Sequence, residues 1–403
     1  MNVASLPSHF AGLQLEFRQE LIVIADWWLE NTIDHEQGGF YGEVAADNVP
    51  VKNASKGIIL NSRVLWFFSE AARELQADKY RQAAQRAYDY IVNYFFDKEH
   101  GGVYWELDAQ GNPINTKKQV YAQAFTIYAL TAYYQLTQDA RVLAQALACF
   151  ELLEKNTIDC EHEGYLEAFT REWGVIEDVR LSDKDLNFPK SQNTHLHVLE
   201  AYTTLNKVHP TPEIAAALRY NIELFDKYMI DKDTYHLRMF LDNDWKDHSP
   251  GFTYGHDIEA SWLIAKALES LSDVAYTKAL MPTLIKITEV TLTEGVGAHG
   301  HVMDAYDFAT QQHLRDIVWW VQAEALVGFL FAYSETKEIK YLTAAEAIWA
   351  FIKKFQIDKK NGEWFWLANM GDVQTNAYYK VGFWKCPYHN GRAMMEAAHY
   401  LAK

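Results

Sequence analysis

The chain has 403 residues, and its 37 basic and 54 acidic side chains give a formal net charge of −17 with histidine neutral. This acidic balance argues against nucleic acid and anionic membranes as partners, and 49% hydrophobic with 23% charged residues excludes a disordered or collagen-like chain. No segment approaches the roughly 18 consecutive apolar residues of a membrane span, and residues 1–17 lack the pattern of a secretion signal. Three cysteines without metal-site spacing indicate free thiols. We therefore expect a cytoplasmic protein.

A repeat of 62 to 72 residues runs through the whole chain. Its marker is a cluster with an acidic first residue, turn-forming residues in the middle and an alternating aromatic stretch after them, which is typical of a short β-hairpin. Six such clusters predict six equivalent units. In chain order they occupy residues 34–44, 97–107, 159–169, 231–241, 294–304 and 358–368.

Helical periodicity fills the segments between the clusters. Each unit holds two helices, because about 63 residues accommodate two helices of about 15 to 20 residues, their connection and a hairpin. The helix before a cluster carries more charge, whereas the helix after it is richer in alanine and aromatic residues and is expected to lie in an inner ring. The clearest helical segments are 17–33, 80–96 and 348–357 before a cluster, and 59–76, 121–136 and 258–271 after one.

Twelve helices in six pairs predict an all-α fold, an (α/α)6 barrel with short β-hairpins between the repeats. We expect residues 1–403 to form this barrel as a single domain. An open solenoid of six helical hairpins is the alternative, because periodicity does not distinguish an open array from a closed ring.

Polar and aromatic residues that are unusual for a buried ring recur near the start of the helix after each cluster. They fall at similar positions in every repeat, so in a closed barrel they meet at one end of the inner ring. Helical spacing directs Asn193 and His197 to one face, whereas His195 points away from His197. The candidates, in chain order, are Arg63, Tyr121, Asn193 with His197, His256 with Glu259, Trp320 with Glu324, and Trp384 with His389.

This convergence predicts a pocket for acid–base chemistry. The positive ends of the inner-helix dipoles lower histidine pKa values and stabilise a developing oxyanion. Glu259 is predicted to hold His256 in one tautomer. The sequence contains no closed zinc ligand set, no di-metal motif and no nucleotide-binding glycine motif, so we expect neither a metal nor a cofactor.

Four strings make a family resemblance recognisable: SQNTHLHVLEAY (191–202), YGHDIEASWL (254–263), WWVQAEA (319–325) and FWKCPYHNGRA (383–393). They resemble the cellobiose 2-epimerases, within the N-acylglucosamine 2-epimerase superfamily. The resemblance runs from the first predicted helix to the last and implies the same (α/α)6 fold. It also implies epimerisation at C2 of the reducing-end sugar of β-1,4-linked disaccharides, from cellobiose to glucosyl-mannose and from lactose to epilactose, through an enediolate.

The resemblance implies roles for the candidate residues. His256 and His389 match the two acid–base residues at C2, His197 assists ring opening, and Glu259 supports His256. Trp320 is preferred to Trp319 as a sugar platform because it shares a helical face with Glu324. The residues predicted to bind the sugar are Arg63, Tyr121, Asn193, Trp320, Glu324 and Trp384.

Several alternatives remain open at this point. An N-acylglucosamine 2-epimerase or an aldose–ketose isomerase would use nearly the same histidines, although the KCPYHNGRA string favours the disaccharide branch. A glycoside hydrolase is a more distant alternative, because hydrolysis requires two opposed carboxylates. A carbohydrate-binding protein accounts for the tryptophans but not for three histidines. We expect a small-molecule partner, a disaccharide, and a monomer or weak homodimer.

Overall fold

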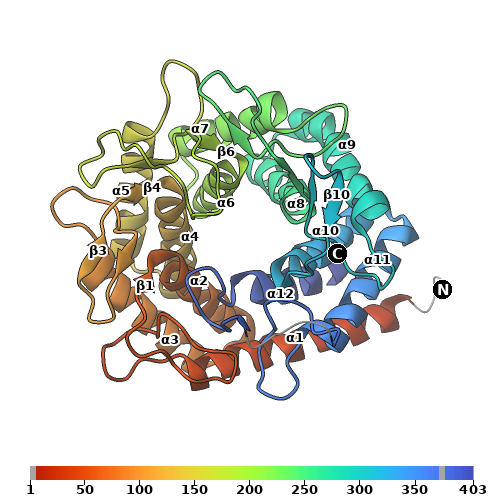
Figure 1. Ribbon diagram of the computed structural model, residues 1–403, viewed down its shortest axis with the longest axis horizontal. Helices are drawn as coiled ribbons and strands as arrows, with labels where there is room; N and C mark the ends of the chain where they lie inside the picture. The colour runs from red at the N-terminus through yellow and green to blue at the C-terminus, as the bar shows by residue number, and fades with distance from the viewer. Residues whose placement is uncertain (1–5, 372–376, 403) are drawn as a thin grey trace.

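The computed structural model describes residues 6–371 and 377–402, so residues 1–5, 372–376 and 403 of the predicted domain lie outside the described part. Its helices form two concentric rings (Figure 1). The inner ring consists of α2 (Ile58–Leu75), α4 (Val120–Thr137), α6 (Gln192–Val208), α8 (Tyr254–Leu271), α10 (Trp319–Thr336) and α12 (Tyr388–Ala402). The outer ring consists of α1 (Leu6–Asn31), α3 (Asp78–Tyr90), α5 (Ala140–Asn156), α7 (Pro212–Leu224), α9 (Val274–Val290) and α11 (Ile339–Phe351).

The inner ring closes on itself. Each inner helix packs against the next, and α12 packs against α2 as well as against α1. This closure confirms the predicted (α/α)6 barrel and excludes the open solenoid. Helices such as α4 and α10 are apolar on almost every side, because each lies between two inner neighbours and an outer helix. Within the described residues, no helix combines the length and apolar character that crossing a membrane requires.

The six clusters fold as tight turns, each closed by a single antiparallel bridge, and are thus shorter than the predicted hairpins. In five of the six turns the side chain of the first Asp accepts backbone N–H groups two and three residues later, which explains the acidic start of the pattern. The bridged pairs are Ile33–Phe40, Phe96–Val103, Ile158–Tyr165, Ile230–Leu237, Val296–Val302 and Ile357–Trp364. Four outer helices reach their turn through a π-helical segment, namely η2 (Ile91–Phe95), η3 (Phe225–Met229), η4 (Thr291–Gly295) and η5 (Ile352–Gln356).

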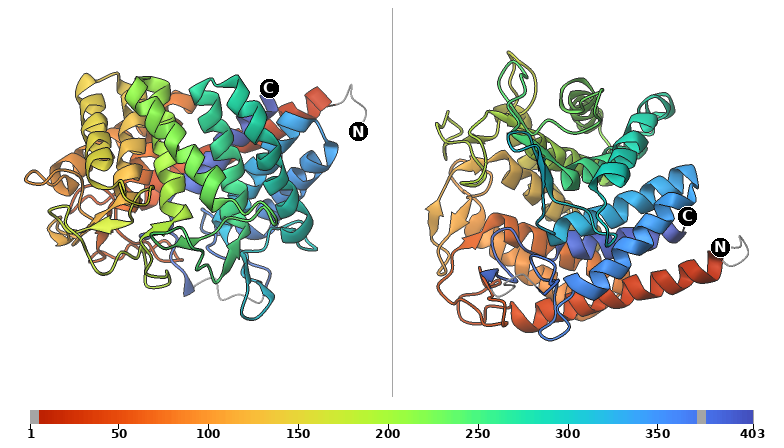
Figure 2. Two further views of the ribbon diagram at one scale, coloured as in Figure 1. Left: turned by 90° about the horizontal axis from the view of Figure 1, so that it is seen from above. Right: turned by 45° about the vertical axis from the view of Figure 1, so that its right-hand side comes forward.

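Short antiparallel strands join neighbouring units to one another. A bridge between Val44 and Val381 links the first unit to the last. The strands and turns gather at one end of the barrel, below the helices in the left view of Figure 2, so this end is built from loops of all six units. The sheets are β1 (Lys56–Gly57) with β2 (Glu106–Leu107) and β3 (Pro113–Asn115), β4 (Lys118–Gln119) with β5 (Ala168–Phe169), β6 (Lys190–Ser191) with β7 (Phe240–Leu241), and β8 (Gly251–Thr253) with β9 (Ala305–Asp307) and β10 (Gln312–Leu314).

Candidate active site

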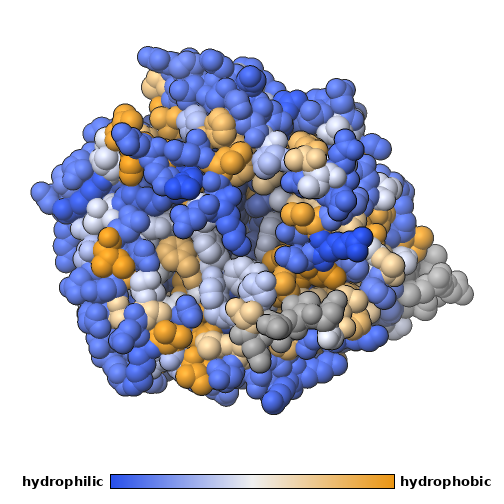
Figure 3. All heavy atoms as spheres, viewed as in Figure 1, coloured by the Kyte–Doolittle hydropathy of each residue, from blue (hydrophilic) through white to orange (hydrophobic). Residues whose placement is uncertain are grey.

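The loop end of the barrel contains a cavity of about 560 Å³, and the molecule is hollowed at its centre on this face (Figure 3). The first two turns of the inner helices form one part of its wall, and the positive ends of the helix dipoles point towards it. Loop residues 181–185, 366, 377–379 and 384 form the rest of the lining. Glu324 lies behind this wall, hydrogen-bonded to His389. The other nine predicted site residues line the cavity: Arg63, Tyr121, Asn193, His197, His256, Glu259, Trp320, Trp384 and His389.

The helical repeat arranges most of these residues in two layers, which lie four residues apart, about 6 Å along the helix axis. The upper layer contains the second residue of four inner helices, namely Tyr121, Asn193, Trp320 and His389. The deeper layer contains the sixth residue of four inner helices, namely Arg63, His197, Glu259 and Glu324.

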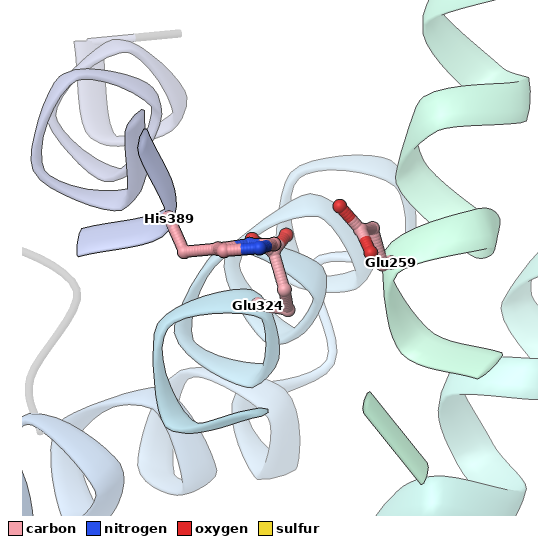
Figure 4. Close-up of side chains that lie close together, drawn as sticks. All are labelled: Glu259, Glu324 and His389. Atoms are coloured by element: carbon pink, nitrogen blue, oxygen red, sulfur yellow. The ribbon is translucent and has the colours of Figure 1, made fainter. Parts of the chain in front are cut away.

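Glu324 fixes the orientation of His389 and its tautomer (Figure 4). Nδ1 of His389 lies 2.6 Å from Oε1 of Glu324, and this oxygen also accepts a hydrogen bond from Arg392. The oxygen is therefore an acceptor, so Nδ1 carries the proton and Nε2 carries the lone pair. Burial, together with the guanidinium groups of Arg63 and Arg392, lowers the pKa of His389 well below its usual value.

His256 has a different partner from the one that the sequence predicts. Its Nδ1 lies 2.6 Å from Oγ1 of Thr253, whereas Glu259 accepts a hydrogen bond from Arg392. The predicted orientation of His256 by Glu259 is thus wrong. The physical reason is depth, since His256 lies in the first turn of α8 beside the residue that precedes the helix, and Glu259 lies one turn further down the axis. Burial lowers the pKa of His256 to about 3, with a smaller contribution from His197.

Trp320 packs close to both histidines. Its ring centroid is 4.8 Å from that of His256 and 5.5 Å from that of His389. Imidazoles from α8 and α12 therefore lie at the same part of the cavity. The neighbouring Trp319 also lines the cavity, but it packs on Trp366 with ring centroids 4.4 Å apart.

Arg63 and Asn193 offer polar atoms to a ligand. Nη2 of Arg63 donates to the hydroxyl of Tyr121 at 2.7 Å, and the guanidinium lies 4.2 Å from the ring centre of Phe125. Nε of Arg63 and Oδ1 of Asn193 are buried without a hydrogen-bond partner among the described residues. Buried polar atoms are normally paired, so a donor and an acceptor left open at this cavity suit the hydroxyl groups of a sugar.

Sequence interpretation missed a buried ion cluster beneath the histidines. Arg392 donates to Glu200, Glu259 and Glu324, and all four side chains are buried. Glu200 also accepts from Nδ1 of His197 at 3.0 Å. The signal available in the sequence was the presence of two charged residues, Arg392 and Glu200, inside predicted inner helices. A charge at such a position requires a partner across the barrel.

The side chains of Glu259, Glu324 and His389 also have the spacing of a metal site. Ligand atoms of Glu259, Glu324 and His389 lie within 4.8 Å of one another, and Figure 4 shows them converging from three inner helices. Arg392 hydrogen-bonds both glutamates and so supplies a positive charge at this place. The donor set thus fits an ion-pair cluster, and catalysis without a metal stays our prediction.

The chain is similar to several known proteins over almost its whole length. Residues 39–390 match the N-acylglucosamine 2-epimerase (GlcNAc 2-epimerase) family. Cellobiose 2-epimerase of Bacteroides fragilis is 41% identical, with 95% of this chain and 98% of that protein covered. The structure of cellobiose 2-epimerase from Bacillus thermoamylovorans has a TM-score of 0.91 at 39% identity, covering 96% of this chain and 99% of that one. A D-mannose isomerase of Marinomonas mediterranea is 23% identical, covering 93% and 94%. The chain therefore belongs to the N-acylglucosamine 2-epimerase family and is an enzyme with epimerase activity.

Proposed function

We propose that this enzyme epimerises C2 of the reducing-end sugar of β-1,4-linked disaccharides, converting cellobiose to glucosyl-mannose and lactose to epilactose. The observation that carries the proposal is the pair of histidines, His256 and His389, which flank Trp320 from two different helices. The similarity to cellobiose 2-epimerases supports a disaccharide substrate. The cavity volume of about 560 Å³ lies within the usual range of small-molecule sites, about 300 to 1,000 Å³.

In the proposed mechanism the sugar ring opens first, with His197 assisting proton movement and Glu200 orienting it. The aldehyde then makes the C2 proton acidic, and Nε2 of His389 accepts this proton while Glu324 stabilises the imidazolium. Arg63 stabilises the negative charge that develops on the enediolate oxygens. That charge also favours protonation of His256 by solvent, and the imidazolium donates this proton to the opposite face of C2. His389 then releases the proton that it took from C2 to solvent.

Thr253 suits this alternation because a hydroxyl group both donates and accepts hydrogen bonds. It bonds Nδ1 of His256 whether the imidazole is neutral or charged. By contrast, the carboxylate of Glu324 accepts from His389 and favours a single tautomer. The two histidines thus have partners that match different roles.

A proton NMR time course with cellobiose in D2O tests the proposed function. We expect deuterium at C2 of both cellobiose and its epimer, with little at C1, because the two histidines exchange their protons with solvent. Deuterium mainly at C1 with a ketose product would instead make the enzyme an aldose–ketose isomerase. Release of free glucose would indicate a glycoside hydrolase, and an unchanged substrate would indicate a binding protein.

Replacing Thr253 with valine is expected to lower kcat about 2- to 10-fold, with little change in KM. The change removes one hydrogen bond to His256 and keeps the shape of the side chain, and one such bond contributes about 0.5 to 1.5 kcal/mol. Thr253→Ser keeps the hydroxyl and is the matched control. Steady-state assays on cellobiose measure both variants, and a valine variant as active as the serine variant would remove Thr253 from the mechanism.

A further inference from the structure

Two cavity residues, Trp384 and His389, come from one short segment, the loop that leads into α12 and the first turn of that helix. His389 must be placed accurately, since its bond to Glu324 is 2.6 Å long and its ring lies 5.5 Å from that of Trp320. The residues that follow each of them, Lys385 and Asn390, are completely buried.

Glu363 holds this segment from outside the cavity. Its Oε1 accepts from Nζ of Lys385 at 3.0 Å and from Nδ2 of Asn390 at 2.7 Å. Its Oε2 accepts from Nε1 of Trp28 on α1 at 2.9 Å. Glu363 is buried and is absent from the cavity lining, so it reaches the chemistry only through its neighbours.

The ammonium of Lys385 makes this anchor strong. Among the described residues its only ion pair is with Glu363, and both side chains are 0% exposed. A buried charge that loses its partner is strongly unfavourable, so the loop moves if the pair is broken. Lys385 also lies 5.5 Å from the ring centre of Trp319, another residue of the cavity wall.

We propose that Glu363 is a positioning residue, which fixes Trp384 and His389 in the cavity by binding the two residues that follow them. Its catalytic consequence rests on the proposed function, in which His389 accepts the C2 proton. The anchor itself rests only on the hydrogen bonds of Glu363.

The first test compares Glu363→Gln with Glu20→Gln. Glu20 is the matched control, since it also makes a carboxylate-to-indole bond between α1 and the same turn, accepting from Nε1 of Trp364 at 2.8 Å. No hydrogen bond connects it to the loop before α12 within the described residues. We expect kcat on cellobiose to fall about 10- to 100-fold in Glu363→Gln and less than threefold in Glu20→Gln, because misplacing a catalytic group by about 1 Å costs about 100-fold.

A pH profile separates positioning from a purely structural role. Burial, Arg63, Arg392, His197 and His256 lower the pKa of His389, which also faces Glu324. A displaced and more hydrated imidazole has a pKa closer to its ordinary value, so the acid limb of kcat/KM is expected to move to higher pH in Glu363→Gln. A role in stability alone scales the activity equally at every pH and leaves the limb in place, which would overturn the proposal.

A second readout does not depend on the proposed function. The rate at which diethyl pyrocarbonate modifies His389, followed by peptide mass spectrometry, is expected to rise at least about threefold in Glu363→Gln and to stay at the wild-type value in Glu20→Gln. If wild-type enzyme leaves cellobiose unchanged, the proposed function fails while this rate still tests the anchor. An unchanged rate in Glu363→Gln contradicts the anchor. If that variant does not fold, Lys385→Met replaces it with the same expectations.

Discussion

Replacing His389 with phenylalanine is expected to lower kcat for cellobiose epimerisation by about 100- to 10,000-fold, with circular dichroism unchanged. Phenylalanine keeps the ring shape between Trp320 and the cavity wall but has no atom that accepts a proton. His256→Phe is expected to have an effect of the same size. It also has a distinct signature, because His389 still exchanges the C2 proton, so deuterium enters recovered cellobiose without formation of the epimer.

Two other histidines serve as controls for this prediction. His399 lies on the same helix as His389, and its side chain is 51% exposed, so His399→Phe is expected to leave kcat unchanged. His195 is fully buried, bonds the carbonyl of Ser191 and accepts from the amide of Tyr165, so His195→Phe is expected to lower the unfolding temperature. Near-normal turnover in a folded His389→Phe enzyme would eliminate its role as a base. Loss of folding in that variant would assign the residue to packing.

Replacing Arg392 with methionine is expected to lower the free energy of unfolding by about 3 to 5 kcal/mol and to abolish activity. The guanidinium is the common partner of three buried carboxylates, and methionine fills much of its volume without its charge. Thermal or denaturant unfolding measures the loss. Arg141→Met is the control, because the Arg141 guanidinium is exposed in its ion pair with Asp139, and we expect its unfolding transition to stay close to that of the wild-type protein.

The stability of the Arg392 variant is expected to depend on pH in a defined direction. In the wild-type protein, burial raises the pKa of Glu200, but Arg392, His197 and Tyr388 outweigh burial and lower it to about 2. The ionised Glu200 thus contributes stability above its unfolded pKa, and this contribution is lost as the pH falls towards 2.

Without Arg392, burial acts on Glu200 with much less opposition, so its folded pKa rises above the unfolded value. Burial already raises the pKa of Glu324 well above its usual value, and loss of Arg392 removes the main charge that opposes this rise. Such groups contribute stability at low pH that is lost as the pH rises. We therefore expect Arg392→Met to unfold more easily at pH 8 than at pH 5. An equal loss of stability at every pH would contradict the role of Arg392 as counter-charge, and Glu259→Gln in the Arg392→Met background is expected to restore part of the loss.

The sequence by itself determined the helical repeat and the depth of the site residues. Helical periodicity and turn chemistry are local properties, so six clusters and twelve helices can be read without knowledge of contacts. Residues near the start of each inner helix, such as Asn193, His256 and His389, meet at one end because every unit runs in the same direction around the ring. This is why the cavity-lining positions on the inner helices could be predicted from their place in the repeat, whereas loop residues 181–185 and 377–379 could not.

Only the tertiary structure decided which side chains bind one another across the barrel. Three features depend on how each helix is oriented about its axis and on how deep each residue lies. They are the contact of α12 with α2, the hydrogen bond between Thr253 and His256, and the Arg392 cluster. Glu363 shows the same limit, since its partners Lys385 and Asn390 lie 22 and 27 residues away in sequence. Spacing along one helix encodes a face and a depth, whereas a hydrogen bond requires two such faces from different helices to coincide within about 3 Å.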